Sequence, residues 1–231
     1  MLDYQLTSII ITIICYFILV VVLVSKYLKN KIKLDTKFIT RTAIFASISA
    51  LLYIIPYLKF PILFFPSFLE IHFDEIPALI AGFAYGPISG AMVIIIKTII
   101  KLPFTSTLCV GELADLIYGL ILVIPSALIY KKNRNIFGAL KGLILASVLQ
   151  VVISSFLTTF VMLEFYMSVM GLSKEVILNM CKLANPNVTS LDWNFLLLVA
   201  APFNLLKDIL LLVLTLLLYK RIKKLIDKIS L

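Results

Sequence analysis

Ionisable side chains that interrupt long apolar runs are the residues of this chain best placed to do chemistry. Lys97, Lys101, Glu112, Asp115 and Lys207 all lie in or beside such runs. An ionised group in hydrocarbon costs roughly 2.5–3.5 kcal/mol even on lenient insertion scales, so each group needs a partner or a function. Two hypotheses follow. Either the two lysines near position 100 pair with the two acids, or these groups line a polar cavity.

Lys207 favours the cavity hypothesis. Asn204 precedes it by three residues, so both side chains share one helical face. The neighbouring acid, Asp208, points about 100° away on a helix and cannot share that face. No acid on the same segment has the spacing to face Lys207. We therefore expect Asn204 and Lys207 to contact a ligand.

Recognisable catalytic motifs are absent from the sequence. It contains no phosphate loop, no H-E-x-x-H zinc motif and no G-x-S-x-G nucleophile motif. His72 is the one histidine and cannot build a metal site alone, and Cys15, Cys109 and Cys181 have no metal-binding or redox spacing. The sequence favours binding over catalysis and predicts no metal and no cofactor. An intramembrane enzyme using Glu112, Asp115 and a metal remains the alternative.

Composition indicates a membrane protein. Of 231 residues, 62% are hydrophobic and 14% charged, far from the balance of a soluble domain. The net charge of +9 could suggest nucleic acid. However, basic residues of apolar chains concentrate in cytoplasmic loops, so we predict a bilayer and no nucleic-acid partner.

Apolar runs mark the expected spans, because a helix needs about 20 apolar residues to cross a bilayer. The first run lacks a basic start and a small-residue cleavage site, so it is predicted to be a retained helix. We expect an all-α integral membrane protein with an additional N-terminal transmembrane helix in residues 1–30 and a six-helix domain in residues 31–231. The runs are 4–25, 42–58, 76–96, 116–130, 142–163 and 193–219.

Basic residues predict the orientation. They cluster at 26–41, 131–141 and 220–228, and all three clusters should be cytoplasmic. This requires the run 76–96 to cross twice, with a turn at Gly86-Pro87. Ala78, Gly82 and Gly90 add a small-residue repeat that allows close helix packing. The N-terminus is then outside and the C-terminus cytoplasmic, in the cell membrane.

An aromatic loop precedes the third run. Between Pro56 and Phe68, four phenylalanines are interspersed with three prolines, and residues 69–74 alternate apolar and polar as an extended stretch would. Two interpretations stay open: the aromatic side chains anchor the loop at the membrane interface, or they form a lid over a planar ligand.

Four segments resemble the substrate-binding (S) subunits of energy-coupling factor (ECF) vitamin transporters, most closely the riboflavin S-components. The resemblance runs from about Lys37 to Lys220 and implies six helices with both ends cytoplasmic. It also implies capture of a vitamin outside the cell, with two ATPase subunits and one transmembrane coupling subunit driving release inside. The segments are FFPSFLEIHFDEIPALIAGFAYGPISG (64–90), VGELADLIYG (110–119), TTFVMLEFYM (158–167) and APFNLLKDIL (201–210).

The resemblance also implies a ligand site. The flavin ring would stack among aromatic side chains, its carbonyl and imide edge would meet Asn204 and Lys207, and its ribityl hydroxyls would suit Asp115 and Thr158. Riboflavin S-components usually have Asn at the positions of Asp115 and Thr158, and Pro at the position of Glu164. An S-component for folate, thiamine or a nucleobase-like compound is therefore the alternative. The expected ligand-binding set is Tyr53, Phe65, Phe68, Leu69, Asp115, Thr158, Asn204 and Lys207.

A small-residue pattern predicts the docking surface. In the S-subunits that this chain resembles, the first helix carries small residues that dock on the coupling subunit. Ala46-x-x-x-Ala50, with Ala43 one turn earlier, matches that pattern. Ordinary helix packing is the alternative for these alanines. A structural helper subunit that binds no small molecule is a further alternative for the whole chain.

Overall fold

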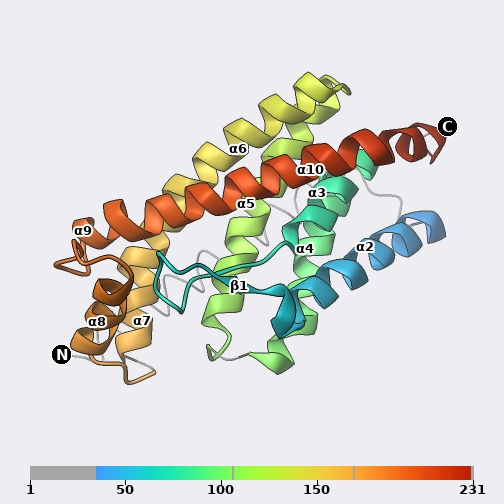
Figure 1. Ribbon diagram of the computed structural model, residues 1–231. Helices are drawn as coiled ribbons and strands as arrows, with labels where there is room; N and C mark the ends of the chain where they lie inside the picture. Colours follow the sequence, from blue (N-terminus) through green and yellow to red (C-terminus); the bar gives the residue numbers. More distant parts are fainter. Residues whose placement is uncertain (1–34, 106, 169, 230–231) are drawn as a thin grey trace. The chain divides into compact units, whose positions relative to one another are not determined.

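The computed structural model describes residues 35–105, 107–168 and 170–229. The chain forms two compact units, Met1–Ile39 and Thr40–Leu231. The additional helix predicted in residues 1–30 lies outside the described residues, so it stays a prediction, as does the division at residue 30. The second unit is a helical bundle with one short antiparallel ribbon (Figure 1).

Helices make up almost all of this bundle, because apolar segments in a bilayer must satisfy their backbone groups internally. The α-helices are α2 (Thr36–Ile54), α3 (Glu75–Tyr85), α4 (Pro87–Lys101), α5 (Val110–Lys132), α6 (Ile136–Leu157), α7 (Leu163–Ser168), α8 (Lys174–Ala184), α9 (Trp193–Phe195) and α10 (Ala201–Ile229). Short 3₁₀ turns occupy Pro56–Leu58 and Leu102–Phe104. Strands β1 (Phe60–Pro61) and β2 (Glu70–Ile71) pair Phe60 with Ile71 and Pro61 with Glu70.

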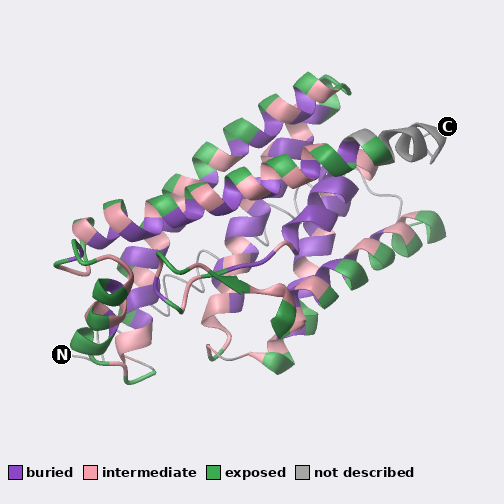
Figure 2. Ribbon diagram, in the orientation of Figure 1, coloured by how far each residue is buried: buried purple, intermediate pink, exposed green. Residues whose placement is uncertain are grey.

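Five helical segments within the described residues are long and apolar enough to cross a membrane, and α3 is a shorter apolar helix. The five segments are Thr36–Ile54, Pro87–Phe104, Val110–Lys132, Ile136–Ser168 and Trp193–Tyr219. Their exposed faces carry large apolar side chains such as Leu149 and Val152, which suit lipid (Figure 2). The predicted class, an all-α integral membrane protein, is confirmed.

The predicted break in the run 76–96 is confirmed. Gly86 ends α3 with a φ of 102°, which favours glycine, and Pro87 begins α4. The small residues then bring the two helices together: a Cβ added at Gly90 would lie 2.8 Å from the carbonyl oxygen of Ala78 and 2.6 Å from a methyl carbon of Val123 on α5. Helix α3 is buried along most of its length, as a helix too short to span must be.

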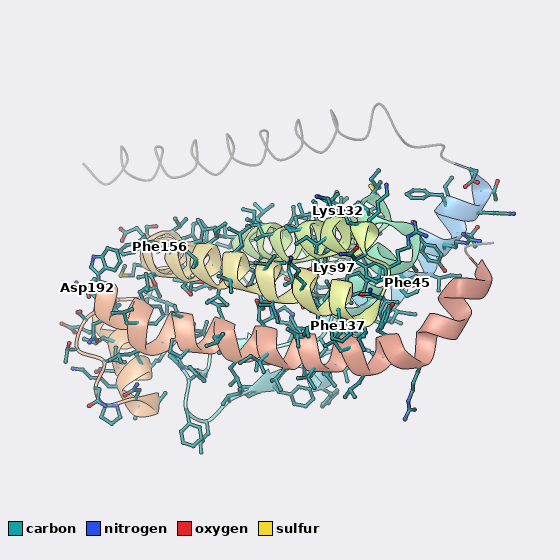
Figure 3. The ribbon with its side chains drawn as sticks, turned by 90° about the horizontal axis from the view of Figure 1, so that it is seen from above. Phe45, Lys97, Lys132, Phe137, Phe156 and Asp192 are labelled. Carbon is teal, nitrogen blue, oxygen red and sulfur yellow. The ribbon has the colours of Figure 1, made fainter. Side chains whose placement is uncertain are left out.

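Aromatic contacts gather the basic segments at one end of the bundle. The hydroxyl groups of Tyr130 and Tyr219, which directly precede two basic clusters, lie 2.8 Å apart. Phe83, near the end of α3, packs on both rings, and Arg41 on α2 lies over the ring of Tyr85. Figure 3 places Lys132 and Phe137 toward this end and Phe156 and Asp192 toward the other. The first residues of α5 and α10 and the last of α6 therefore meet at the opposite end.

Several elements differ from the predicted runs. Helix α5 begins at Val110 rather than near 116, because charge-free runs exclude Glu112 and Asp115, which lie in its first turns. Helix α6 continues through a π-helical turn, η3 (Thr158–Met162), into α7. The amphipathic helix α8 was not predicted, although Ser173 caps its first turn by accepting a hydrogen bond from the Val176 amide.

Gly90→Ala should destabilise the bundle. The new methyl group would overlap Val123 and the Ala78 carbonyl, and overpacking of this kind costs about 1–3 kcal/mol. A lower melting temperature of the detergent-purified protein would show this. Ser47→Ala, on the exposed face of α2, is the control and should change the melting temperature little; equal melting temperatures for both variants would contradict the packing argument.

Candidate functional site

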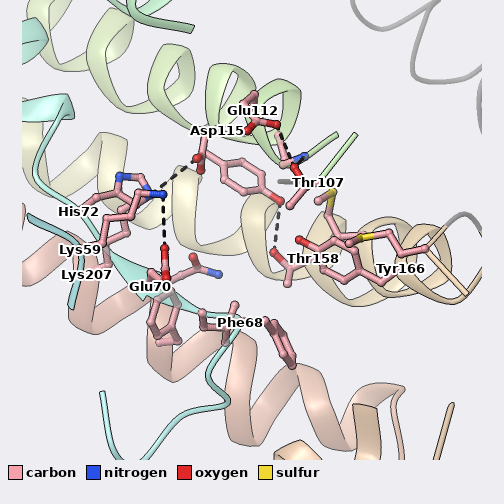
Figure 4. Close-up of a pocket in the computed structure, with 18 of the residues that line it drawn as sticks. Lys59, Phe68, Glu70, His72, Thr107, Glu112, Asp115, Thr158, Tyr166 and Lys207 are labelled. Carbon is pink, nitrogen blue, oxygen red and sulfur yellow. Dashed lines mark hydrogen bonds and ion pairs between the residues drawn. The ribbon is translucent and has the colours of Figure 1, made fainter. Parts of the chain in front are cut away.

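A cavity of about 370 Å³ lies at the end of the bundle away from the basic segments. Its walls come from α2, the residues around β2, the first turns of α5, the π-helical turn η3, α8 and α10, as the close-up in Figure 4 shows. The volume falls in the range of small-molecule sites. Aromatic and thioether side chains form much of the wall, and they include Phe68, Tyr118, Met162, Tyr166 and Met180.

The predicted ligand-binding residues gather here, with one exception. The side chains that line the cavity are Tyr53, Phe68, Leu69, Asp115, Thr158, Asn204 and Lys207. Phe65 does not line it; its ring packs edge-on against Phe203, 5.3 Å away between centroids. Phe64 is 72% exposed and also lies outside the wall. That the lining residues bind a ligand stays a prediction.

Lys207 has a partner that the sequence did not reveal. Its Nζ lies 2.9 Å from Oε1 of Glu75, the first residue of α3. Sequence spacing excluded only acids on the same segment as Lys207, and Glu75 reaches it from a different helix. The pairing leaves the ammonium group at the cavity wall, so Lys207 is both neutralised and available to a ligand.

Of the two hypotheses for the ionisable groups, pairing of the lysines near position 100 with the acids on α5 is not what the described residues show. Lys97 is fully buried and pairs with Asp74, which directly precedes α3. Lys101 donates instead to the Phe104 carbonyl oxygen, 3.1 Å away. The two acids on α5 have hydroxyl partners, since Glu112 accepts from Thr105 and Thr107 and Asp115 accepts from the Tyr53 hydroxyl at 2.5 Å.

His72 connects these ion pairs. Its Nδ1 contacts Asp74 and lies 3.6 Å from Glu75, while Nε2 lies 3.6 Å from Asp115 and 3.3 Å from Lys207. Burial lowers the pKa of His72, but the three carboxylates outweigh both burial and the Lys207 ammonium and raise the pKa to about 9. Three cations (His72, Lys97 and Lys207) therefore face three carboxylates (Asp74, Glu75 and Asp115). We call these six residues the charge cluster.

The charge cluster does not suit a metal. Ligand atoms of His72, Asp74 and Glu75 lie within 4.8 Å of one another. However, the ammonium groups of Lys97 and Lys207 already contact two of these residues, and two fixed cations oppose a divalent ion. Glu112 and Asp115 do not belong to this group, and among the described residues no other three ligand-bearing side chains lie close enough to share an ion.

Two π-helical turns shape the site. The first, η3, carries Thr158 and Met162 to the cavity, and the Thr158 hydroxyl lies 3.2 Å from that of Tyr118. The second, η4 (Leu196–Ala200), immediately precedes α10, and the Asn204 amide nitrogen donates to the carbonyl of its last residue, Ala200, at 2.9 Å. π-helical turns are rare and concentrate at functional sites. Hydropathy gave no signal for either turn.

The loop before α3 lies against the cavity without the predicted alternation. Within residues 69–74 only Glu70 and Ile71 form a strand, and both Ile71 and His72 are buried. The charged partners on α4 and α10 draw His72 and Asp74 inward, which overrides the period-two pattern. Phe68 and Leu69 reach the cavity, whereas the loop tip, with Phe64, is exposed.

Helix α8 supplies wall residues that sequence reasoning missed. Ile177 and Met180 line the cavity, and Ile177 and Cys181 are buried on the same face. The apolar spacing of three and four residues between Ile177, Met180 and Cys181 was the available signal. It was overlooked because the segment is too short and too polar for a membrane span.

The predicted docking residues do not share one face. Ala46 and Ala50 are 1% and 4% exposed and pack inside the bundle, whereas Ala43 is exposed. The burial of Ala46 and Ala50 agrees with the alternative, ordinary helix packing. Docking on a coupling subunit stays a prediction. Thr42 and Ser49 on the same inward face bond to Ser89 and to the Asp74 carbonyl.

Comparison with known proteins identifies the family. The family model described as "ECF transporter, substrate-specific component" matches residues 37–219, and the chain belongs to this family. Members of this family are components of transporters.

Individual relatives agree with this assignment. The chain is 28% identical over 200 residues to the riboflavin transporter RibU of Staphylococcus aureus, covering 85% of this chain and 97% of the relative. It is 27% identical over 131 residues to the riboflavin transporter FmnP of Bacillus subtilis, covering 55% and 69%. A solved S component of a bacterial ECF transporter superposes with a TM-score of 0.62 at 25% identity, covering 82% of this chain and 96% of that one.

Lys97→Met should destabilise the protein strongly, because it leaves Asp74 charged and buried without its ammonium partner. Breaking a buried pair costs about 3–5 kcal/mol. Lys101→Met is the matched control, since Lys101 bonds a carbonyl and no carboxylate within the described residues. Thermal unfolding in detergent compares the two variants. If both variants lose the same amount of thermal stability, the ion pair between Lys97 and Asp74 does not contribute more than the Lys101 hydrogen bond.

Proposed function

We propose that this chain captures riboflavin outside the cell as the substrate-specific subunit of an ECF importer. The observation that carries the proposal is a small-molecule cavity that joins an aromatic wall to a polar, charge-balanced floor. The riboflavin transporters among the relatives support the choice of ligand.

Charge balance favours an uncharged ligand. The cavity wall and the charge cluster together carry five cations against five carboxylates, and Lys59 pairs with Glu70 at 3.4 Å. The cations are Lys59, His72, Lys97, Lys101 and Lys207, and the carboxylates are Glu70, Asp74, Glu75, Glu112 and Asp115. A ligand with a net charge would leave one sign unmatched in a partly desolvated site, which is costly. Riboflavin is neutral at physiological pH. Folate is anionic and thiamine cationic, so both alternatives fit this wall less well.

The polar groups match the edges of a flavin. The Asn204 amide nitrogen already donates to Ser155 and Ala200, which leaves the amide oxygen, with no donor among the described residues, to accept an imide N–H. Lys207 donates to a ring carbonyl. Asp115 and Thr158 lie on neighbouring helices and receive the ribityl hydroxyls. Phe68 and Tyr166, whose rings are 6.2 Å apart between centroids, contact the ring system.

Asn204→Ala should weaken riboflavin binding at least roughly tenfold, because the imide N–H loses its acceptor in a desolvated site. Quenching of riboflavin fluorescence by the detergent-purified protein measures the affinity. Asn187→Ala, at an exposed position, is the control. Unchanged affinity in N204A removes Asn204 from the site, and a protein that ignores riboflavin but binds folate, thiamine or a nucleobase refutes the flavin assignment. A structural helper subunit would bind none of these compounds.

Lys207 needs a paired experiment, because removing it also strands Glu75. Lys207→Met should lower both stability and riboflavin affinity, and the double variant Lys207→Met with Glu75→Gln should regain stability. If Lys207 contacts the ligand, affinity stays low in the double variant. Recovery of full affinity would show that Lys207 acts only by neutralising Glu75.

The finer assembly is also part of the proposal. The chain would work with one transmembrane coupling subunit and two ATPase subunits in the cell membrane, with the C-terminus and the basic segments in the cytoplasm. The exposed small residues Ala43 and Ser47 lie four residues apart on α2. This face, rather than that of Ala46 and Ala50, suits close approach of a partner helix.

Ala43→Leu should abolish riboflavin uptake by cells carrying the coupling and ATPase subunits while leaving binding by the purified chain unchanged. The added bulk obstructs a partner without disturbing the bundle. Ala46→Leu overpacks the interior, so binding and stability should fall together with uptake. Normal uptake by A43L would place the docking surface elsewhere.

A further inference from the structure

Asp208 is a buried acid that the cavity does not use. It lies on α10 directly after Lys207, is 1% exposed, and does not line the cavity. Neither carboxyl oxygen has a partner with hydrogen-bond geometry among the described residues, although the Ser147 side chain lies close enough to interact with the carboxyl group. Buried carboxylates normally accept several hydrogen bonds, so this group requires an explanation.

Helix α6, which faces Asp208, also carries buried polar atoms without a hydrogen-bond partner among the described residues. Asn204 donates to Ser155, which sets the register of α10 against α6. The two helices run in opposite directions, so Asp208, about 6 Å further along α10, is level with the turn of α6 that contains Ser147 and Gln150. Oγ of Ser147 and Oε1 of Gln150 also have no partner within the described part of the chain, and Gln150 is 2% exposed.

The surrounding charges do not neutralise Asp208. The charged groups that act on it are Lys207 on its own helix and Glu75 on α3, whereas α6 contributes the uncharged Ser147. The Lys207 ammonium already bonds Glu75. Since the charge cluster contains three cations and three carboxylates, an ionised Asp208 would add a fourth carboxylate with no cation to match it.

We propose that Asp208 is a proton-binding site in the bundle core, where it carries one proton and donates it to an acceptor oxygen on α6. A protonated carboxyl group removes the unmatched charge and gives Ser147 Oγ or Gln150 Oε1 the donor that each lacks. The O–H···O bond joins α6 to α10 beneath the cavity. It also leaves the Lys207 ammonium on Glu75, at the cavity wall. The proton comes from solvent, and the proposal does not depend on which ligand the cavity takes.

Infrared difference spectroscopy of the full, ligand-free protein in detergent at neutral pH tests the proposal. A protonated carboxyl group has a C=O stretching band that an ionised carboxylate lacks. Asp208→Asn keeps the shape of the side chain and should remove one such band from the wild-type spectrum. A spectrum that retains every protonated-carboxyl band in D208N would overturn the proposal.

Asp192→Asn is the matched control. Asp192 is exposed and accepts hydrogen bonds from the Ser190 hydroxyl and the Asn194 amide, which hold its pKa below the usual range. Its carboxylate is ionised at neutral pH, so the substitution should leave the protonated-carboxyl region unchanged. Loss of the same band in D192N would show that the band does not report Asp208.

A second measurement covers the case in which D208N fails to fold. Isotopic labelling of the aspartate carboxyl carbons in the wild-type protein should shift the protonated-carboxyl band, since Asp74, the other buried aspartate among the described residues, is paired as a carboxylate with Lys97 and His72. A band that does not shift, or no band at all, excludes a protonated aspartic acid. If sodium or potassium instead raises the melting temperature of the wild type and not of D208N, Asp208 binds a metal cation and the proton assignment is wrong.

Discussion

The charge cluster beneath the cavity is the constraint on which the rest of the bundle depends. Two consecutive acids at the start of α3, Asp74 and Glu75, bond to lysines on two different helices, Lys97 on α4 and Lys207 on α10. In hydrocarbon each charge would be costly alone, so the pairs specify how the three helices meet. His72 lies between the pairs and ties the preceding loop to the same point. Packing of small residues between α3, α4 and α5 then completes the arrangement.

The same cluster defines what the cavity can hold. Because its charges are balanced internally, the floor is polar without a net charge, and Lys207 remains exposed to the cavity while bonded to Glu75. The wall above is aromatic and apolar, with contributions from the loop, η3 and α8. A planar, uncharged molecule with hydrogen-bonding edges meets both conditions, which agrees with membership of a family of substrate-specific transport subunits.

Sequence patterns predicted those features that depend on interactions between residues close together in the chain. The turn at Gly86-Pro87 follows from residues that end and begin helices by their own backbone preferences. Asn204 and Lys207 share a face because a helix repeats every 3.6 residues, and both reach the cavity. The membrane class follows from composition alone. Charge-free runs located the spans, but they cut α5 short, because acids in its first turns are tolerated once hydroxyl groups contact them.

The sequence by itself therefore determined the membrane class, the broken span and the helix face that carries the polar pair. Only the tertiary structure decided the partners: Glu75 for Lys207, Asp74 for Lys97, and the bundle interior for Ala46 and Ala50. It also placed Phe65 behind the wall and brought α8 over the cavity. Periodicity shows which side chains share a face of one helix. It cannot show which other helix that face meets, because that depends on contacts between segments distant in the chain.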